Sequence, residues 1–102
     1  MTQYIISPEA ALDLDEISTY YAIHNIEAGE KLLDEFEAKC KYLVNSPNIG
    51  RSYKSLRADL RGLSFSAYII FYRVGNNIVE NLRVVSGSRD LEALFADPDR
   101  GL

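Results

Sequence analysis

The side chains best suited to chemistry gather in the second half of the chain. Residues 51–89 hold seven basic side chains and only two acidic ones, Asp59 and Glu80. The seven are Arg51, Lys54, Arg57, Arg61, Arg73, Arg83 and Arg89. Because arginine presents a planar fork of donors to carboxylates and phosphates, this cluster indicates an anionic partner or target. Residues 1–50 hold nine acidic and three basic side chains, so an internal match between acidic helices and basic strands also explains the asymmetry.

The sequence offers one histidine and one cysteine, and neither is placed for catalysis. His24 falls near the end of a predicted helix without a second candidate ligand or a nearby nucleophile, so we interpret it as a surface or capping residue. Cys40 falls within the apolar stripe of a second predicted helix, which is typical of a packed thiol rather than a nucleophile. We therefore expect no metal site, no cofactor and no intrachain disulfide.

Length and composition indicate one globular domain spanning residues 1–102. Hydrophobic residues make up 47% and charged residues 25% of the chain, the ordinary balance for a folded protein. The net charge of −4 argues against a general polyanion binder. Without a signal peptide or an apolar run near membrane-spanning length, we expect a cytoplasmic protein that makes no membrane contact.

The arginines must be positioned by residues 60–89, which read as an antiparallel meander. Residues 67–74 form the longest apolar run and are rich in Tyr, Ile and Phe, which favour strands. Asn76-Asn77 is the expected two-residue turn of the last hairpin, because asparagine tolerates the positive φ that such turns require. The predicted pairs outward from this turn are Gly75–Ile78, Arg73–Glu80, Phe71–Leu82 and Ile69–Val84.

That register separates an apolar face of the hairpin from a mixed one. The mixed face is predicted to carry Tyr68, Ile70, Tyr72, Val79, Asn81, Arg83 and Val85. It is too apolar for a face left in water, so we expect another molecule to cover it part of the time. The alternative is that the C-terminal segment folds over its tyrosines.

Two amphipathic helices are expected between a short first strand, residues 3–6, and the meander. Ser7-Pro8 starts the first helix, with serine as N-cap and proline at the first helical position, and His24-Asn25 ends it. Its predicted buried stripe is Ala10, Leu14, Ile17 and Tyr21, with Asp13, Asp15 and Glu16 elsewhere. The second helix starts at Asn25 or Glu27 and runs to about Ser46. Its predicted buried stripe is Gly29, Leu33, Phe36, Cys40 and Leu43.

These elements predict an α+β fold of order β-α-α-β-β-β. The short connection between the helices implies an antiparallel helical hairpin, packed on one face of a small, mainly antiparallel sheet. Residues 90–95 are expected to add one or two helical turns that dock onto the body. Residues 97–100 are expected to form a loose end.

Several stretches, taken in order, carry a family resemblance. They are YIISPEAALDLDEISTYY, SPNIGR, LRGLSFSAYIIFYRV and VVSGSRDLEALF, spread over residues 4–95. Together they resemble the RelE/ParE superfamily of toxins from bacterial type II toxin–antitoxin systems. The Pro-x-x-Gly-Arg break, the Y-x-I-x-Y-R strand and the Gly-x-Arg-Asp-Leu ending are most similar to the ParE branch.

The resemblance to the RelE branch implies a ribosome-dependent messenger RNA endoribonuclease. Arg61 and Arg83 match the basic sheet residues of that branch, and Tyr68 or Tyr72 would have to serve as the proton donor. The sequence departs from the nuclease pattern after Arg89, where it has no Tyr, His or Lys. Since arginine is a poor proton shuttle at neutral pH, the enzyme stays the alternative interpretation.

The resemblance to the ParE branch implies a plasmid-stabilisation toxin that inhibits growth by poisoning DNA gyrase through a protein–protein contact, without catalytic residues. The expected target-binding residues are Arg57, Arg61, Arg83 and Arg89. A cognate antitoxin is the expected partner, bound by helix-in-groove and strand-addition contacts. The expected antitoxin-binding residues are Tyr68, Ile70, Tyr72 and Val85. DNA would be reached only indirectly, through the antitoxin, and a non-toxic interaction module of the same fold is a third interpretation.

Overall fold

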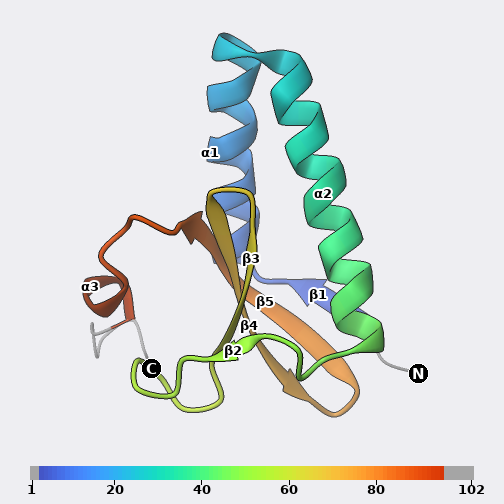
Figure 1. Ribbon diagram of the computed structural model, residues 1–102, viewed down its shortest axis with the longest axis vertical. Coiled ribbons are helices and arrows are strands. Elements are labelled where there is room, and N and C mark those ends of the chain that lie inside the picture. The colour runs from blue at the N-terminus through green and yellow to red at the C-terminus, as the bar shows by residue number, and fades with distance from the viewer. Residues whose placement is uncertain (1–2, 96–102) are drawn as a thin grey trace.

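The computed structural model describes residues 3–95, in eight elements (Figure 1). They are β1 (Gln3–Ile6), α1 (Pro8–His24), α2 (Ile26–Asn45), β2 (Arg51–Ser52), β3 (Arg61–Phe65), β4 (Tyr68–Gly75), β5 (Ile78–Ser86) and α3 (Leu91–Phe95). The expected loose end at residues 97–100 lies outside the described residues. The predicted order of elements is confirmed, with the two-residue β2 added before the meander.

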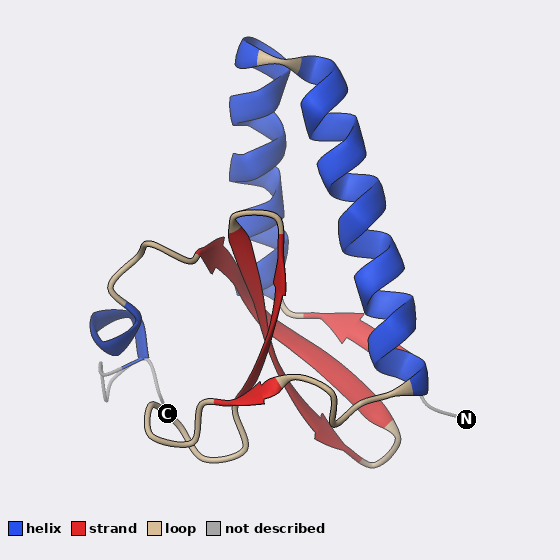
Figure 2. Cartoon of the chain, in the orientation of Figure 1, coloured by secondary structure: helices blue, strands red, loops and turns tan. Residues whose placement is uncertain are grey.

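The strands form one five-stranded sheet of order β1-β5-β4-β3-β2. Only β1 runs parallel to its neighbour β5, and the other pairs are antiparallel. Figure 2 shows α1 and α2 rising together beyond the sheet, with the short α3 apart from them. The predicted α+β architecture is therefore confirmed. No helix in residues 3–95 is both long and apolar enough to span a lipid bilayer.

The helical hairpin is fixed by its capping residues. The Ser7 hydroxyl accepts from the Ala10 N–H at 3.1 Å, and Pro8 takes the first helical position, as predicted. Asn25 alone separates the helices: its N–H donates to the Tyr21 carbonyl at the end of α1, and its side chain accepts from Ala28 to start α2. A Cβ on Gly29 would lie 2.5 Å from the Cβ of Tyr21, so glycine permits the close approach just after the turn.

The hairpin of β4 and β5 begins in the predicted register. Asn76 and Asn77 adopt positive φ, and Gly75 pairs with Ile78 and Arg73 with Glu80. The Arg73 Nε also donates to Glu80 Oε1 at 2.7 Å, so this predicted strand pair is an ion pair as well.

A β-bulge then changes the register. Tyr72 pairs with Asn81 and Phe71 pairs with Arg83, which leaves Leu82 as the extra residue. The predicted pair Phe71–Leu82 is therefore wrong. So is Ile69–Val84, because Ile69 pairs with Val85. Side chains alternate between faces with a period of two, so one inserted residue moves every later side chain of β5 to the other face.

The sheet is covered on both faces. The helix-side core contains Ala10, Leu32, Phe36, Cys40, Leu43, Phe65, Ile70, Tyr72, Val79 and Val84. The opposite core contains Leu60, Ile69, Phe71, Val85 and Leu94. The prediction that the face of Tyr68, Ile70 and Tyr72 is open is wrong, because α1 and α2 pack on that face. The C-terminal helix does cover a face, as the alternative expected, but it is the opposite one.

Candidate partner-binding site

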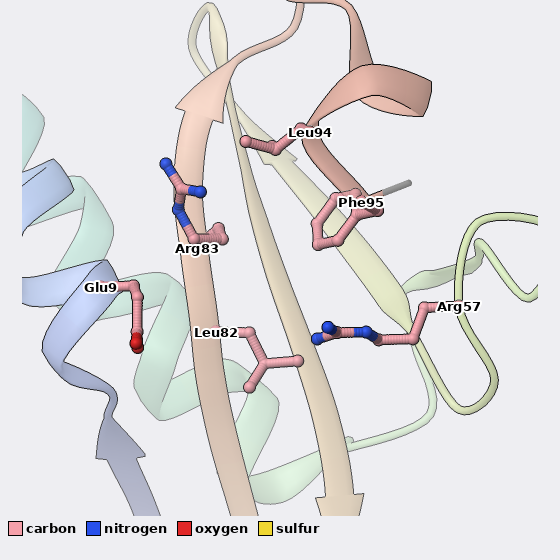
Figure 3. A pocket seen from close by; sticks show the side chains of 6 residues that line it. All are labelled: Glu9, Arg57, Leu82, Arg83, Leu94 and Phe95. Atoms are coloured by element: carbon pink, nitrogen blue, oxygen red, sulfur yellow. The ribbon is translucent and has the colours of Figure 1, made fainter. Parts of the chain in front are cut away.

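Arg57 and Arg83 line one pocket of about 320 Å³ beside β5 (Figure 3). The pocket adjoins the core on the sheet face opposite the helical hairpin, which we call the outer side of β5. We call this pocket the arginine pocket, and its lining is Glu9, Arg57, Leu82, Arg83, Leu94 and Phe95. These residues come from α1, the loop after β2, β5 and α3. The structure thus brings together two of the four predicted target-binding arginines.

The apolar wall of the arginine pocket is built by the bulge and by α3. The bulge residue Leu82 packs against the opposite core, and Leu94 is buried in it. Asp90 caps α3 by accepting from the Ala93 N–H at 3.1 Å. The Phe95 ring meets Phe71 edge-on, with ring centroids 5.0 Å apart. The Arg57 guanidinium lies over the Phe95 ring, 5.8 Å from the ring centroid.

Arg83 is held by a carboxylate of α1. Its Nε donates to Asp13 Oδ2 at 2.8 Å and its Nη2 donates to Asp13 Oδ1 at 2.9 Å, a bidentate pair. The hydrogen bond with Asp13 raises the pKa of the Arg83 guanidinium above its ordinary value, against the opposing effect of burial. For Arg83, the internal match of acidic helix and basic strand is therefore confirmed.

Asp13 also binds the backbone of β5 where that strand extends beyond its pairing with β1, a role that the sequence did not predict. Its Oδ2 accepts from the Val84 N–H at 2.9 Å, and the Ser7 hydroxyl donates to the Leu82 carbonyl at 3.0 Å. The start of α1 thus takes over from β1 as the neighbour of β5. Asp13 is predicted to lie outside the buried stripe of the first helix, yet it follows the buried Ala10 by three residues and precedes Ile17 by four, a spacing that indicates the same helix face.

The other two target-binding candidates lie elsewhere. Arg61 donates from Nη1 to the carbonyls of Gly50 at 2.8 Å and Asn48 at 3.2 Å, which holds the linker after α2. It lines a separate pocket of about 300 Å³. Arg89 is exposed in the turn between β5 and α3. Arg57 and Arg83 therefore share a site that excludes Arg61.

Tyr72 also supports the linker after α2. Its hydroxyl donates to the Pro47 carbonyl at 2.7 Å and accepts from the Gly50 N–H at 2.9 Å. Burial raises the pKa of Tyr72, while the Gly50 N–H and the charge of Arg61 act in the opposite direction. Because the Tyr72 side chain is fully buried and both hydrogen-bond partners of its hydroxyl lie inside the protein, its role is structural.

The remaining antitoxin-binding candidates are mostly inaccessible. Ile70 is 0% and Val85 4% exposed, each in one of the two cores. Tyr68 is half-buried beside Phe65, and burial together with the neighbouring Tyr21 raises the pKa of Tyr68. Of the four candidates, Tyr68 alone has an accessible ring.

Cys40 and His24 take the predicted structural roles. Cys40 is fully buried, and its sulfur accepts from Asn81 Nδ2 at 3.4 Å. Burial raises the pKa of the Cys40 thiol to about 11, so it is a poor nucleophile. His24 is exposed at the end of α1, with its ring tilted by 36° against the Tyr20 ring and the ring centroids 4.3 Å apart. Residues 3–95 contain no group of three His, Cys, Asp or Glu side chains placed to hold a metal ion.

Comparison with known proteins identifies the family. Residues 4–91 match the family described as the ParE toxin of the type II toxin–antitoxin system parDE. The chain belongs to the ParE toxin family. Toxin ParE1 of Caulobacter vibrioides is 32% identical over 94 residues, which cover 91% of this chain and 97% of that relative. The fold is similar to a solved structure from the chromosomal ParDE toxin–antitoxin system of P. aeruginosa, with a TM-score of 0.69, 24% identity, and coverage of 84% of this chain and 95% of that one.

Within this ParE family member, the residues that sequence reasoning missed lie around the arginine pocket. Glu9 lies in the first turn of the first predicted helix and has no predicted binding role, and Leu82 is predicted to pair with Phe71 in a regular hairpin. Their place in one pocket follows from the bulge and from the packing of α1 along β5, which no local pattern encodes. Leu94 and Phe95 were expected only to dock onto the body.

Proposed function

We propose that this ParE family toxin inhibits DNA gyrase, and with it replication, through a protein–protein contact, and that a cognate antitoxin neutralises it. Residues 1–102 act as one toxin domain in the cytoplasm, where gyrase works. The observation that supports it best is that three of the four candidate nuclease side chains are engaged within the fold.

Cleavage of RNA through its 2′-hydroxyl requires a base, a proton donor and free positive charge near the phosphate. Arg83 is paired with Asp13, Arg61 binds two backbone carbonyls, and the Tyr72 proton is directed at the Pro47 carbonyl. Each would have to leave a buried or partly buried contact before it could act on RNA. A protein–protein contact needs no such rearrangement, which favours gyrase over the RelE-like alternative.

Accessible side chains are the better candidates for both protein partners. Arg57 and Arg89, together with the exposed part of Arg83, stay as proposed target contacts, and Tyr68 stays as a proposed antitoxin contact. Arg61 is a weaker candidate because its guanidinium holds the linker after α2. Any binding to operator DNA is proposed to occur through the antitoxin.

Induction of the chain alone in a bacterial host tests the proposal, with DNA and protein synthesis pulse-labelled separately. We expect early loss of DNA synthesis and filamentous cells while translation continues, and rescue by co-expressed antitoxin. Early loss of protein synthesis with cut messenger RNA would instead establish the nuclease. Normal growth with soluble protein present would identify an inert interaction module.

A further inference from the structure

We propose that the arginine pocket receives an acidic side chain, flanked by an apolar one, from the cognate antitoxin. This inference rests on the proposed function, because it assigns a site to the antitoxin. It moves part of the antitoxin contact away from the helix-covered face of Tyr68, Ile70 and Tyr72 to the outer side of β5.

The shape of the pocket fits side-chain insertion. Its volume of about 320 Å³ is large enough for one or two side chains, and Leu82, Leu94 and Phe95 supply an apolar wall. A partner side chain that covers this wall removes apolar surface from water. An apolar residue of the partner therefore has a place beside the arginine.

The charges of the pocket specify the polar part of the ligand. Figure 3 shows Glu9 and Arg57 on opposite sides of Leu82. The Arg83 charge is matched by Asp13, whereas no carboxylate within residues 3–95 lies within 4.0 Å of the Arg57 guanidinium. A ligand carboxylate is thus attracted to the Arg57 side and repelled from the Glu9 side. An amide or a lysine in its place lacks this match.

The edge of β5 beside the pocket is closed to strand addition. The Val84 N–H is bound to Asp13 and the Leu82 carbonyl is bound to Ser7. An incoming segment finds no backbone partners at this part of β5, so its side chains must provide the contact.

The test measures affinity of the antitoxin for variants of the toxin by titration calorimetry. Arg57→Gln is expected to weaken binding about tenfold through loss of a charge-assisted hydrogen bond. Glu9→Gln is expected to tighten binding, because it removes a repulsive charge while keeping the size of the side chain. Arg51→Gln is the matched control: Arg51 is exposed outside the pocket, and its loss is expected to leave affinity unchanged. Circular dichroism verifies that each variant is folded.

A double-mutant cycle locates the ligand side chain. Each Asp or Glu in the toxin-binding part of the antitoxin is replaced by its amide and tested against the wild-type toxin and Arg57→Gln. We expect one acidic residue whose replacement weakens binding to the wild type but not to Arg57→Gln. If the antitoxin binds all toxin variants equally, or if no acidic residue couples to Arg57, the pocket assignment is overturned while the proposed function stands. If the wild type does not bind the antitoxin at all, both fail.

Discussion

Replacement of Asp13 by asparagine tests the link between α1 and β5 most sharply. The Asp13 carboxylate accepts three hydrogen bonds, two from the Arg83 guanidinium and one from the Val84 N–H. Asparagine can place its one oxygen at the Oδ2 position and keep the bonds from Arg83 Nε and the Val84 N–H. Its NH2 group then faces the Arg83 Nη2 donor, so one of the three bonds is lost together with the carboxylate charge. Losing one hydrogen bond to a charged group costs roughly 1.5–3 kcal/mol, and removing the charged partner of a buried pair costs roughly 3–5 kcal/mol, so the loss is roughly 1.5–5 kcal/mol.

The partial solvent exposure of the Asp13–Arg83 pair places the expected loss of stability near the lower end of that range. The side chains of Asp13 and Arg83 are 9% and 21% exposed, so water reaches the guanidinium and compensates part of the loss. We expect Asp13→Asn to lower the free energy of unfolding by about 2 kcal/mol, less than the roughly 3–5 kcal/mol for breaking a fully buried pair. The melting temperature would fall by roughly 8–16 °C.

Urea denaturation followed by circular dichroism measures this effect. Asp15→Asn, an exposed neighbour on the same helix, is the matched control and is expected to change stability by less than about 0.5 kcal/mol. In an Arg83→Gln background, Asp13→Asn should cost at least about 1 kcal/mol less than in the wild type, because the ion pair is already absent. A loss below about 1 kcal/mol for Asp13→Asn in the wild type would refute the reasoning.

Three further predictions concern the linker, the helical turn and the buried thiol. Tyr72→Phe removes the hydroxyl that binds Pro47 and Gly50, and should cost roughly 1–3 kcal/mol in urea denaturation; an unchanged midpoint would show that the linker does not need it. Gly29→Ala gains helix propensity but places a Cβ 2.5 Å from that of Tyr21, so we expect a net loss of roughly 1–2 kcal/mol, and a raised melting temperature would contradict the close approach. Because burial raises the pKa of Cys40 to about 11, its contribution to stability is complete below the ordinary thiol pKa and is lost as pH rises toward about 11. Cys40→Ala should flatten that decline in a pH series of unfolding free energies, and an equally steep decline in the variant would assign it to other groups.

Local chemistry made the elements predictable from the sequence. Ser7-Pro8 marks the start of α1, Asn25 marks the boundary between the helices, and Asn76-Asn77 marks the turn between β4 and β5. Each signal depends on the conformational preference of one or two residues, so it can be read from the sequence without knowledge of the tertiary structure.

The layering of the sheet could not be predicted in the same way. Leu82 is an unremarkable strand residue, and nothing in its neighbours indicates that it is the extra residue of a bulge. Beyond that bulge, Val84 and Val85 exchange faces relative to a regular hairpin. Which face of β4 the helices cover depends on their packing as a whole, since Tyr68 to Val74 is apolar on both faces.

For the candidate site too, local features could be predicted from the sequence and tertiary contacts could not. Sequence composition was enough to identify the basic character of residues 51–89 and to raise an internal ion pair as an explanation for part of it. It could not tell Arg83, which Asp13 holds, from Arg57, which has no such partner among residues 3–95, because the difference arises from contacts far apart in the sequence.

The central claim is that this ParE family toxin acts on DNA gyrase rather than on messenger RNA. The most direct measurement is gyrase-catalysed supercoiling of relaxed plasmid in the presence of the purified chain, with translating ribosomes and messenger RNA assayed in parallel. We expect supercoiling to fall as the chain is added, prior addition of antitoxin to restore it, and the messenger RNA to stay intact. Full supercoiling together with cleaved messenger RNA would contradict it.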